Sequence, residues 1–502
     1  MAKTIMIQGT MSNAGKSLIA AGLCRIFVQD GYKTAPFKSQ NMALNSFITK
    51  EGLEMGRAQA VQAQAAKIEP SVLMNPILLK PTNDIGSQVI VNGEVRGNMP
   101  AREYFKYKKN LVGDIMTAFN KLSDEYDIIV IEGAGSPAEI NLKSFDIVNM
   151  GMAKMADAPV ILVGDIDRGG VFAQLVGTVM LLEQEEKSRI KGLVINKFRG
   201  DKTILDPGVE MLEERIDIPV VGVVPYMQVD IEDEDSLSER LTVNKRADLV
   251  DIAVIRLPRI SNFTDFDVLE NIEGVSLRYV ASVKDFGNPD MIILPGSKST
   301  VQDLIWLRES GLESMIFKAY NKGKLIFGIC GGYQMLGEVI EDEKCIETEI
   351  KKIKGLGLLP ITTFFEGEKR RTRVNGKVED LKGIFGELSG AEIEGYEIHM
   401  GVSKLKSGEN FLTIKDINSQ EEIKDGCVYK NVCGTYIHGI FDLDGIRDGI
   451  VDILFKSKGI KRTKSSIDIK AYKQQQFDKL AEELRKSLDM HRIYEIMGLD
   501  KK

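Results

Sequence analysis

The chain has 502 residues, and because one hydrophobic core stops growing at about 250–300 residues, at least two domains are expected. Hydrophobic residues make up 43% of the chain and charged residues 28%, which excludes a chain that is disordered throughout. The chain has 66 Lys and Arg against 73 Asp and Glu, a net charge of −7, so general binding to nucleic acid is not expected. A negative net charge still allows local basic pockets.

Cysteine and histidine usage points to a reducing compartment. The five cysteines form no CxxC pair, and the three histidines lie far apart, so neither a disulfide framework nor a dedicated zinc site is expected. No apolar run approaches the ~18 residues of a membrane span. The first residues run into a strand-like segment without a signal-peptide pattern. We therefore expect a soluble, cytoplasmic protein without a membrane partner.

Short apolar runs rich in β-branched residues recur in the first part of the chain. They lack clean alternation, which is typical of strands buried on both faces, and they cover residues 4–8, 127–132, 158–165, 191–196 and 218–224. Helical patterns lie between them, including 16–30 and 101–123. This order predicts a doubly wound, mainly parallel α/β sheet over residues 1–228.

The second part of the chain repeats this order after an acidic stretch. Residues 229–249, with acidic residues gathered at 230–235, are expected to be a solvated linker. Strand-like runs then return at 251–256, 275–280, 290–295 and 324–329, which predicts a second doubly wound α/β domain over 250–445. Residues 446–502 are predicted to be a helical extension. One helical face carries Phe477, Leu480, Leu484 and Leu488, and we expect it to pack against the second domain.

The first strand ends in GTMSNAGKS, Gly9 to Ser17, directly before a helical pattern. A Gly-rich turn that opens a helix points backbone N–H groups at a phosphate. Lys16 would reach the β- and γ-phosphates of a nucleotide, and the hydroxyl of Ser17 would bind Mg²⁺. Thr10 stands where the strict motif has its first glycine, so Gly9 and Gly15 form a variant of that loop. An ordinary helix cap is the alternative.

Two further residues lie where predicted strands end, at the edge where open α/β sheets bind ligands. Glu132 ends the strand at 127–132 and could hold Mg²⁺ directly or through water. Asn196 ends the strand at 191–196 and could read the edge of an adenine base. Taken alone, either could equally be a helix cap or a turn residue.

A candidate nucleophile follows a strand of the second domain. Cys330 stands between an apolar strand and a helical pattern, in KLIFGICGGYQMLG. Small neighbours allow the tight turn that lifts a nucleophile above a sheet. His438, in CGTYIHGIFD, is the expected base, and His399 is the second choice. Gly296 and Gly331 could supply backbone N–H groups to an oxyanion.

Several segments resemble known families. The segments 328–334 and 434–439 look like the glutaminase domain of class I amidotransferases, in the branch that amidates corrinoids. The phosphate loop is similar to that of dethiobiotin synthetase and of the cobyrinate-amidating enzymes. Four segments resemble the cobyric acid synthase family in particular: 38–46, 132–142, 164–173 and 196–201.

The resemblance implies an enzyme with an ATP-binding domain and a glutaminase domain. It implies that ATP, Mg²⁺ and glutamine are used to amidate the b, d, e and g carboxylates of adenosylcobyrinic acid a,c-diamide. A polyanionic substrate should meet local positive or polar groups, although each candidate could equally be a solvated surface residue. The candidates within the family-like segments are Lys38, Gln40, Asn41, Arg168, Lys197 and Arg199.

Some alternatives stay open on the sequence. Many class I glutaminases carry an acid two residues after the histidine, where this chain has Ile440, so the group that orients His438 is not assigned; Glu397 and Asp442 are candidates. Cobyrinic acid a,c-diamide synthase is the close competitor. From another class, a P-loop ATPase switch with a degenerate rear module is the rival. The sequence assigns no oligomeric state.

Overall fold

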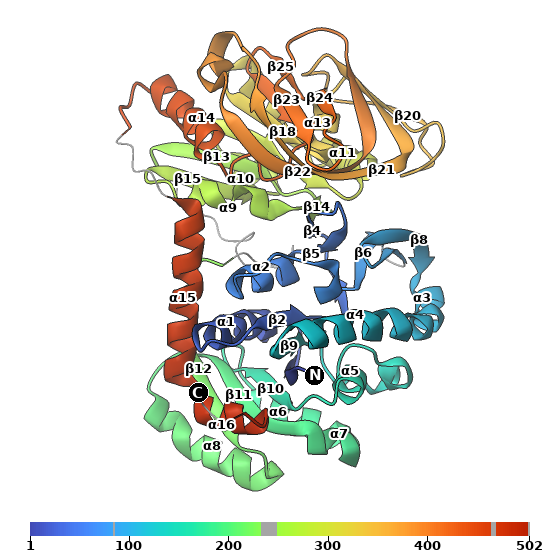
Figure 1. Ribbon diagram of the computed structural model, residues 1–502. Coiled ribbons are helices and arrows are strands. Elements are labelled where there is room, and N and C mark those ends of the chain that lie inside the picture. Colours follow the sequence, from blue (N-terminus) through green and yellow to red (C-terminus); the bar gives the residue numbers. More distant parts are fainter. Residues whose placement is uncertain (84–85, 232–247, 463–467, 500–502) are drawn as a thin grey trace. The chain divides into compact units, whose positions relative to one another are not determined.

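A computed structural model describes residues 1–83, 86–231, 248–462 and 468–499 (Figure 1). The chain forms two compact units. Unit 1 contains Met1–Ala43, Glu54–Glu232 and Lys470–Lys502, and unit 2 contains Leu44–Leu53 and Asp233–Ile469. The expected acidic linker falls mostly on residues 232–247, outside the described residues. No helix in the described ranges is long and apolar enough to cross a membrane.

The main sheet of unit 1 is parallel throughout, with strand order β12-β11-β10-β1-β9-β2. Its central strands are buried on both faces, which explains their unbroken apolar runs. The expected doubly wound sheet is confirmed, and β2 is an edge strand that the patterns did not predict. The strands are β1 (Lys3–Gly9), β2 (Thr34–Phe37), β9 (Ile128–Glu132), β10 (Val160–Asp165), β11 (Ile190–Phe198) and β12 (Val220–Pro225).

Helices flank this sheet, and unit 1 also contains a separate, smaller sheet. The region expected as one helix over 101–123 is α3 (Ala101–Tyr107), a 3₁₀ turn and α4 (Val112–Glu125). The other helices are α1 (Lys16–Gln29), α2 (Arg57–Ala65), α5 (Met150–Met155), α6 (Val171–Leu181), α7 (Gln184–Arg189) and α8 (Lys202–Ile216). The smaller sheet was not predicted and contains β3 (Gln40–Met42), β6 (Ile77–Asn83), β7 (Gly86–Val91) and β8 (Glu94–Pro100).

The last two helices, α15 (Ile469–Ser487) and α16 (Met490–Ile496), pack within the core of unit 1. The expectation that their apolar face packs against the second domain is wrong. Gly22 on α1 leaves a notch for them, since a Cβ at this position would lie 2.2 Å from Leu484 Cδ1. Arg25, which is 1% exposed, is bound by Asp478 on α15 at 2.8 Å. Helix amphipathicity predicted burial but carried no information about the partner.

Unit 2 contains a six-stranded sheet in the order β15-β13-β16-β18-β26-β25, parallel except for its last pair. All four predicted strands are present. The strands are β13 (Val250–Ile255), β15 (Val275–Val280), β16 (Met291–Leu294), β18 (Leu325–Ile329), β25 (Cys427–Tyr429) and β26 (Val432–Thr435). The helices around it include α11 (Thr300–Glu309), α12 (Leu312–Asn321), α13 (Gly331–Leu336) and α14 (Asp444–Ser457).

A largely antiparallel sheet completes unit 2 and was not predicted. Its two long strands, β21 (Ile361–Val378) and β22 (Glu392–Leu405), pair along most of their length. The remaining strands are β19 (Val339–Glu341), β20 (Lys352–Lys354), β23 (Leu412–Asp416) and β24 (Glu422–Asp425).

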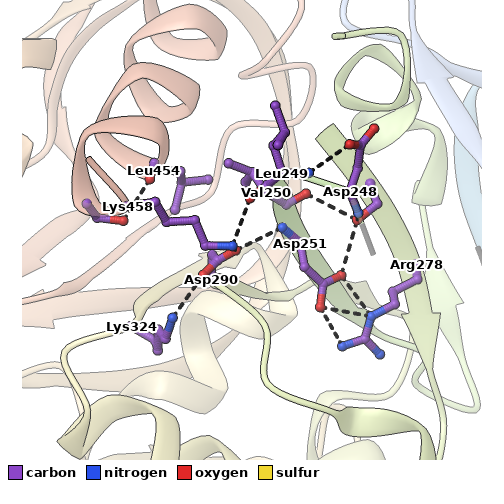
Figure 2. Close-up of polar contacts among 11 residues, drawn as sticks. Asp248, Leu249, Val250, Asp251, Arg278, Asp290, Lys324, Leu454 and Lys458 are labelled. Atoms are coloured by element: carbon purple, nitrogen blue, oxygen red, sulfur yellow. Dashed lines mark hydrogen bonds and ion pairs between the residues drawn. The ribbon is translucent and has the colours of Figure 1, made fainter. Parts of the chain in front are cut away.

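A network of ion pairs lies near the amino ends of β13, β16 and β18 in unit 2 (Figure 2). Arg278 Nε lies 2.8 Å from Asp251 Oδ1, and the backbone N–H of Asp251 donates to Asp290. Asp290 in turn pairs with Lys324 at 2.9 Å and with Lys458 at 2.6 Å. Burial alone would raise the pKa of Asp290, but the two lysines outweigh it and hold the pKa below its usual value. The charges gather at one end of the sheet, so the carboxyl ends of the strands are left for other chemistry.

Candidate active sites

The loop between β1 and α1 has the form of a phosphate-binding loop. Gly15 has φ +97°, and a Cβ here would lie 2.0 Å from Asn196 Nδ2, so only glycine fits. Asn196 Nδ2 donates to the backbone oxygen of Ala14 at 2.8 Å. Lys16 Nζ donates to the backbone oxygens of Met11 and Gly135 at 2.9 and 3.2 Å. Asn196 therefore holds the loop from the end of β11, and Lys16 crosses the loop.

Ser17 and Glu132 lie together, as the interpretation of a metal site requires. Ser17 Oγ donates to Glu132 Oε1 at 2.8 Å, and Lys38 Nζ lies 2.9 Å from the same oxygen. Gln62 Nε2 donates to Glu132 Oε2 at 2.5 Å, with Gln59 Nε2 at 3.4 Å. A hydroxyl and a carboxylate beside a phosphate loop are oxygen donors that suit Mg²⁺. The two glutamines were missed, although their spacing of three places them on one face of α2.

The residues suggested for substrate binding fall into two groups. Lys38 is buried and paired, Gln40 Oε1 accepts from Tyr104 OH at 2.6 Å, and Asn41 Nδ2 donates to Gln59 at 3.0 Å. The others are exposed or half-exposed and lie at or after the carboxyl ends of β10 and β11. Arg168 is exposed, Lys197 pairs with Asp165 at 2.7 Å, and Arg199 pairs with Asp167 at 2.8 Å.

Cys330 occupies a strained turn between β18 and α13. Its φ of +50° is in a region that non-glycine residues rarely adopt. Glycine is required around it, because a Cβ at Gly332 would lie 1.9 Å from the backbone oxygen of Leu294, and one at Gly328 would lie 2.5 Å from Leu336 Cδ1. Cys330 occupies the N-cap position of helix α13. This is the elbow geometry of a nucleophile.

His438 lies between this thiol and a buried carboxylate. Its Nδ1 lies 2.6 Å from Oδ2 of Asp265, and Cys330 is near enough to the ring to raise the pKa of His438. Oδ1 of Asp265 accepts from the backbone N–H of Gly439 at 3.1 Å, which fixes the carboxylate. Burial would lower the pKa of His438, but Asp265 and Cys330 outweigh it and raise the pKa to about 10. The three side chains form the series carboxylate, imidazole, thiol.

Neither residue suggested as the orienting group takes this role. Glu397 binds His399 Nε2 at 3.2 Å and Arg370 Nε at 2.6 Å. Asp442 lies beside Gly439, to whose backbone oxygen its own N–H donates at 2.9 Å. The Asp265 carboxylate was missed because it lies far from His438 in the sequence. The available signal was the segment RISNFTDFD (259–267), which follows the end of the buried strand β13 after three intervening residues.

The predicted oxyanion glycines lie at the same place. A Cβ on Gly296 would be 3.1 Å from His438 Cε1, and one on Gly331 would be 2.9 Å from the backbone nitrogen of Ser297. Ser297 Oγ donates to Asp303 at 2.7 Å, which holds the loop. Burial raises the pKa of Asp303 to about 6 despite this bond. The strand ends therefore bring the loop at Gly296, the elbow and His438 together.

The raised pKa of His438 gives a prediction for Asp265→Asn. A free imidazole titrates at about 6.5, whereas His438 should keep its proton until about pH 10. Without the carboxylate, burial lowers this pKa, so the alkaline limb of the pH–rate profile for glutamine hydrolysis should move to lower pH. The rate at pH 7.5 should fall by roughly 10²-fold or more, because the ring also loses its orientation. Glutamate release measured from pH 6 to 10 checks both effects.

Glu397→Gln and Asp442→Asn are the matched controls. Each removes a carboxylate from the same region without touching the bond between Asp265 and His438. Both should leave the alkaline limb in place. A shift in either control that equals the shift in Asp265→Asn would contradict the assignment of Asp265.

Two family models match this chain and define its class of protein. Residues 251–445 match the model of the CobB/CobQ-like glutamine amidotransferase domain, and residues 5–237 match that of the CobQ/CobB/MinD/ParA nucleotide binding domain. The chain is thus a glutamine amidotransferase-type enzyme that also carries a nucleotide-binding domain.

Full-length relatives define the family. The chain is 61% identical to a cobyric acid synthase of Lachnoclostridium phytofermentans, over 99% of both chains. It is 58% identical to a cobyric acid synthase of Ruminiclostridium cellulolyticum, over 99% of this chain and 97% of the relative. A cobyric acid synthase of Clostridium acetobutylicum is 54% identical over 99% of both. The chain belongs to the cobyric acid synthase family, which confirms the resemblance seen in its motifs.

Proposed function

We propose that this enzyme transfers ammonia from glutamine to carboxylates of a corrinoid at the expense of ATP. The acceptor is adenosylcobyrinic acid a,c-diamide, and the carboxylates are b, d, e and g. The observation that carries the proposal is the pairing of His438 with the buried Asp265 carboxylate, next to the Cys330 thiol at the elbow. The names of the relatives, all cobyric acid synthases, support the choice of acceptor.

Glutamine hydrolysis takes place in unit 2. The thiolate of Cys330 attacks the side-chain amide carbon of glutamine, and the backbone N–H groups of Gly296 and Gly331 stabilise the oxyanion. His438 donates its proton to the departing nitrogen, so that ammonia and a thioester result. His438 then takes a proton from water, which attacks the thioester and releases glutamate. Asp265 keeps the ring in the required tautomer throughout.

The carboxylate is activated in unit 1, because a free carboxylate is a very poor electrophile. Lys16 and the backbone from Gly9 through Thr10 to Gly15 bind the phosphates of ATP. Ser17 and Glu132 would hold Mg²⁺, which neutralises phosphate charge. A corrinoid carboxylate attacks the γ-phosphate, ADP leaves, and ammonia displaces phosphate from the acyl phosphate.

The remaining residues of unit 1 have supporting roles in this proposal. Asn196 positions the loop by donating from Nδ2 to the backbone oxygen of Ala14. Its side-chain oxygen Oδ1 is then the atom that accepts from the adenine amino group. Lys38 orients Glu132, and Gln40 and Asn41 extend the same polar region. Arg168 and Arg199, at the exposed edge, attract the polyanionic corrinoid.

Glutamine labelled with ¹⁵N in its amide group tests the proposal. Cobyrinic acid and its a,c-diamide, each as the adenosyl form, are offered as acceptors side by side. Mass spectrometry should show up to four labelled amides on the a,c-diamide. Two labelled amides on cobyrinic acid and none on its a,c-diamide would instead identify a diamide synthase. Glutamine-independent ATP hydrolysis without amidation would favour the ATPase switch.

Lys16→Ala should stop amidation with either nitrogen source. The substitution removes the cation that meets the phosphates, and we expect a loss of roughly 10²-fold or more. Amidation is measured with glutamine and, separately, with a high concentration of ammonium. Lys202→Ala, an exposed lysine of α8, is the control and should change neither rate. A Lys16→Ala enzyme that keeps its ammonium-dependent rate would contradict the role of the loop.

A further inference from the structure

Residues Leu44–Leu53 belong to unit 2, although the chain on both sides of them belongs to unit 1. The segment is buried along much of its length: Asn45, Ser46 and Thr49 are each 1% exposed, and Ile48 is fully buried. Exposed connections between elements rarely bury polar groups in this way. The segment 44–53 is therefore packed into the unit that contains Cys330.

Two side chains of unit 2 bind the main chain of Ser46. The N–H of Ser46 donates to Asn262 Oδ1 at 3.3 Å, and its carbonyl oxygen accepts from Tyr396 OH at 3.4 Å. Asn262 Nδ2 donates to Tyr396 OH at 3.0 Å, which closes a ring of three hydrogen bonds. Asn262 is 2% exposed and Tyr396 6%, so water does not replace these bonds freely.

Asn262 directly precedes the turn that carries Asp265. It has φ +52° and heads the 3₁₀ helix Phe263–Phe266, and its backbone oxygen accepts from the N–H of Asp265 at 3.1 Å. A residue in this strained conformation persists when its surroundings hold it. The bond from Ser46 to the Asn262 side chain is one such restraint. The position of the Asp265 carboxylate therefore depends in part on segment 44–53.

Tyr396 is in direct contact with His438. Their backbones form a bridge, with N–H to O distances of 3.2 and 2.9 Å, and their rings stack at 5.3 Å between centroids. Ile48 packs in one apolar cluster with Tyr396 and Ile398. The backbone oxygen of Ile398 lies 3.6 Å from the sulfur of Cys330. Segment 44–53 thus contacts direct neighbours of all three reacting or orienting side chains.

We propose that Asn262 and Tyr396 are positioning residues: their hydrogen bonds to the main chain of Ser46 hold Asp265 and His438 in place. Segment 44–53 then makes glutamine hydrolysis depend on the unit that binds nucleotide, an inference that rests on the proposed function.

The anchors of the segment support this dependence. Lys38, shortly before Leu44, pairs with Glu132 at 2.9 Å, beside the phosphate loop. Glu54, directly after Leu53, pairs with Lys80 at 2.9 Å, and both side chains are buried. Each end of the segment is therefore fixed in unit 1, one of them at the carboxylate proposed to bind the metal. We therefore expect a change in the partners of Glu132 to reach Ser46 through Lys38 and the strand β3 (Gln40–Met42) that follows it.

Two substitutions in the full-length enzyme test the positioning role. Tyr396→Phe removes the hydroxyl and keeps the ring that stacks on His438. Asn262→Gly removes the amide and keeps a residue that tolerates positive φ. In each variant, kcat for glutamate release should fall about tenfold with KM little changed. The alkaline limb of the pH profile should also move to lower pH, since a displaced Asp265 raises the pKa of His438 less.

Tyr320→Phe, a half-buried tyrosine of α12 in the same unit, is the matched control and should behave as wild type. Thermal unfolding is recorded for all variants. If both Tyr396→Phe and Asn262→Gly keep the wild-type rate and pH profile, the positioning role is wrong. A fall in rate without a shift of the alkaline limb would indicate general loosening and would also overturn it.

An insertion tests the dependence on unit 1. Two glycines placed between Ala43 and Leu44 lengthen the connection and leave every contact of Ser46 available. Glutamate release is compared with glutamine alone and with added ATP, Mg²⁺ and corrinoid acceptor. We expect the wild type to be stimulated several-fold, and the insertion variant to keep its unstimulated rate but lose the stimulation.

Two results would overturn this dependence: a wild type that is not stimulated, or an insertion variant that is stimulated as strongly as the wild type. Ammonium-dependent amidation by the wild type separates this inference from the proposed function. If the wild type makes no corrinoid amide from ammonium, the proposed function fails, while the rates of glutamate release still decide the roles of Asn262 and Tyr396.

Discussion

Cys330→Ala should abolish amidation with glutamine and leave amidation with ammonium intact. The variant cannot form a thioester, so glutamate release should fall by about three orders of magnitude or more. The phosphate loop, Ser17 and Glu132 belong to the other unit and keep their contacts. Both rates are measured on one preparation, with glutamate and amidated corrinoid as products.

Cys345→Ala provides the control for loss of a thiol. Cys345 is an exposed cysteine, and its replacement should change neither rate. A Cys330→Ala enzyme that still used glutamine at the full rate would show that the nucleophile has been misassigned. Loss of the ammonium-dependent rate as well would show that Cys330 is needed for folding and would contradict its role as the nucleophile.

Leu484→Ala should lower the free energy of unfolding of unit 1 by about 3 kcal/mol. Leu484 is fully buried, and its Cδ1 fills the notch above Gly22 on α1. Denaturant unfolding gives the total loss. Hydrogen exchange of the α1 amides shows where the stability is lost. Ile204→Ala, on an exposed side chain of α8, should change stability by less than about 0.5 kcal/mol.

The notch allows a sharper test with a second substitution. Gly22→Ala alone should destabilise the unit, since its methyl would lie 2.2 Å from Leu484 Cδ1. In the double variant the smaller side chain at 484 makes room for that methyl. The free energies of unfolding lost in the two single variants should therefore add up to about 1–3 kcal/mol more than the loss measured for the double variant. Strict additivity would show that α15 does not pack on α1.

The sequence predicted the elements whose signal is local. The parallel strands are continuous apolar runs, and the turns at Gly15 and Cys330 need small residues that are visible in the motif. These features are dictated by neighbours in the chain, so periodicity and glycine placement were enough to find them. Both doubly wound sheets followed from them.

The features that were missed depend on contacts between distant parts of the chain. The polar segment after β13 marks a candidate site, but it does not identify Asp265 as the partner of His438, because the two meet only when the loop after β13 reaches the end of β26. The apolar face of α15 predicted burial but did not specify α1 as its partner. Residues 44–53 lie inside a nucleotide-binding sequence, and their place in unit 2 follows from buried contacts to Asn262 and Tyr396.

The return of α15 and α16 to unit 1 has a consequence for synthesis on the ribosome. Unit 1 begins at the first residues but takes part of its core from Leu480, Leu484 and Ile493. Those residues are translated after the whole of Asp233–Ile469. The nascent nucleotide-binding unit must therefore wait, incomplete, while most of the glutaminase emerges from the exit tunnel. Pauses in translation before residue 470 would prolong this wait and expose α1 to chaperones or proteases.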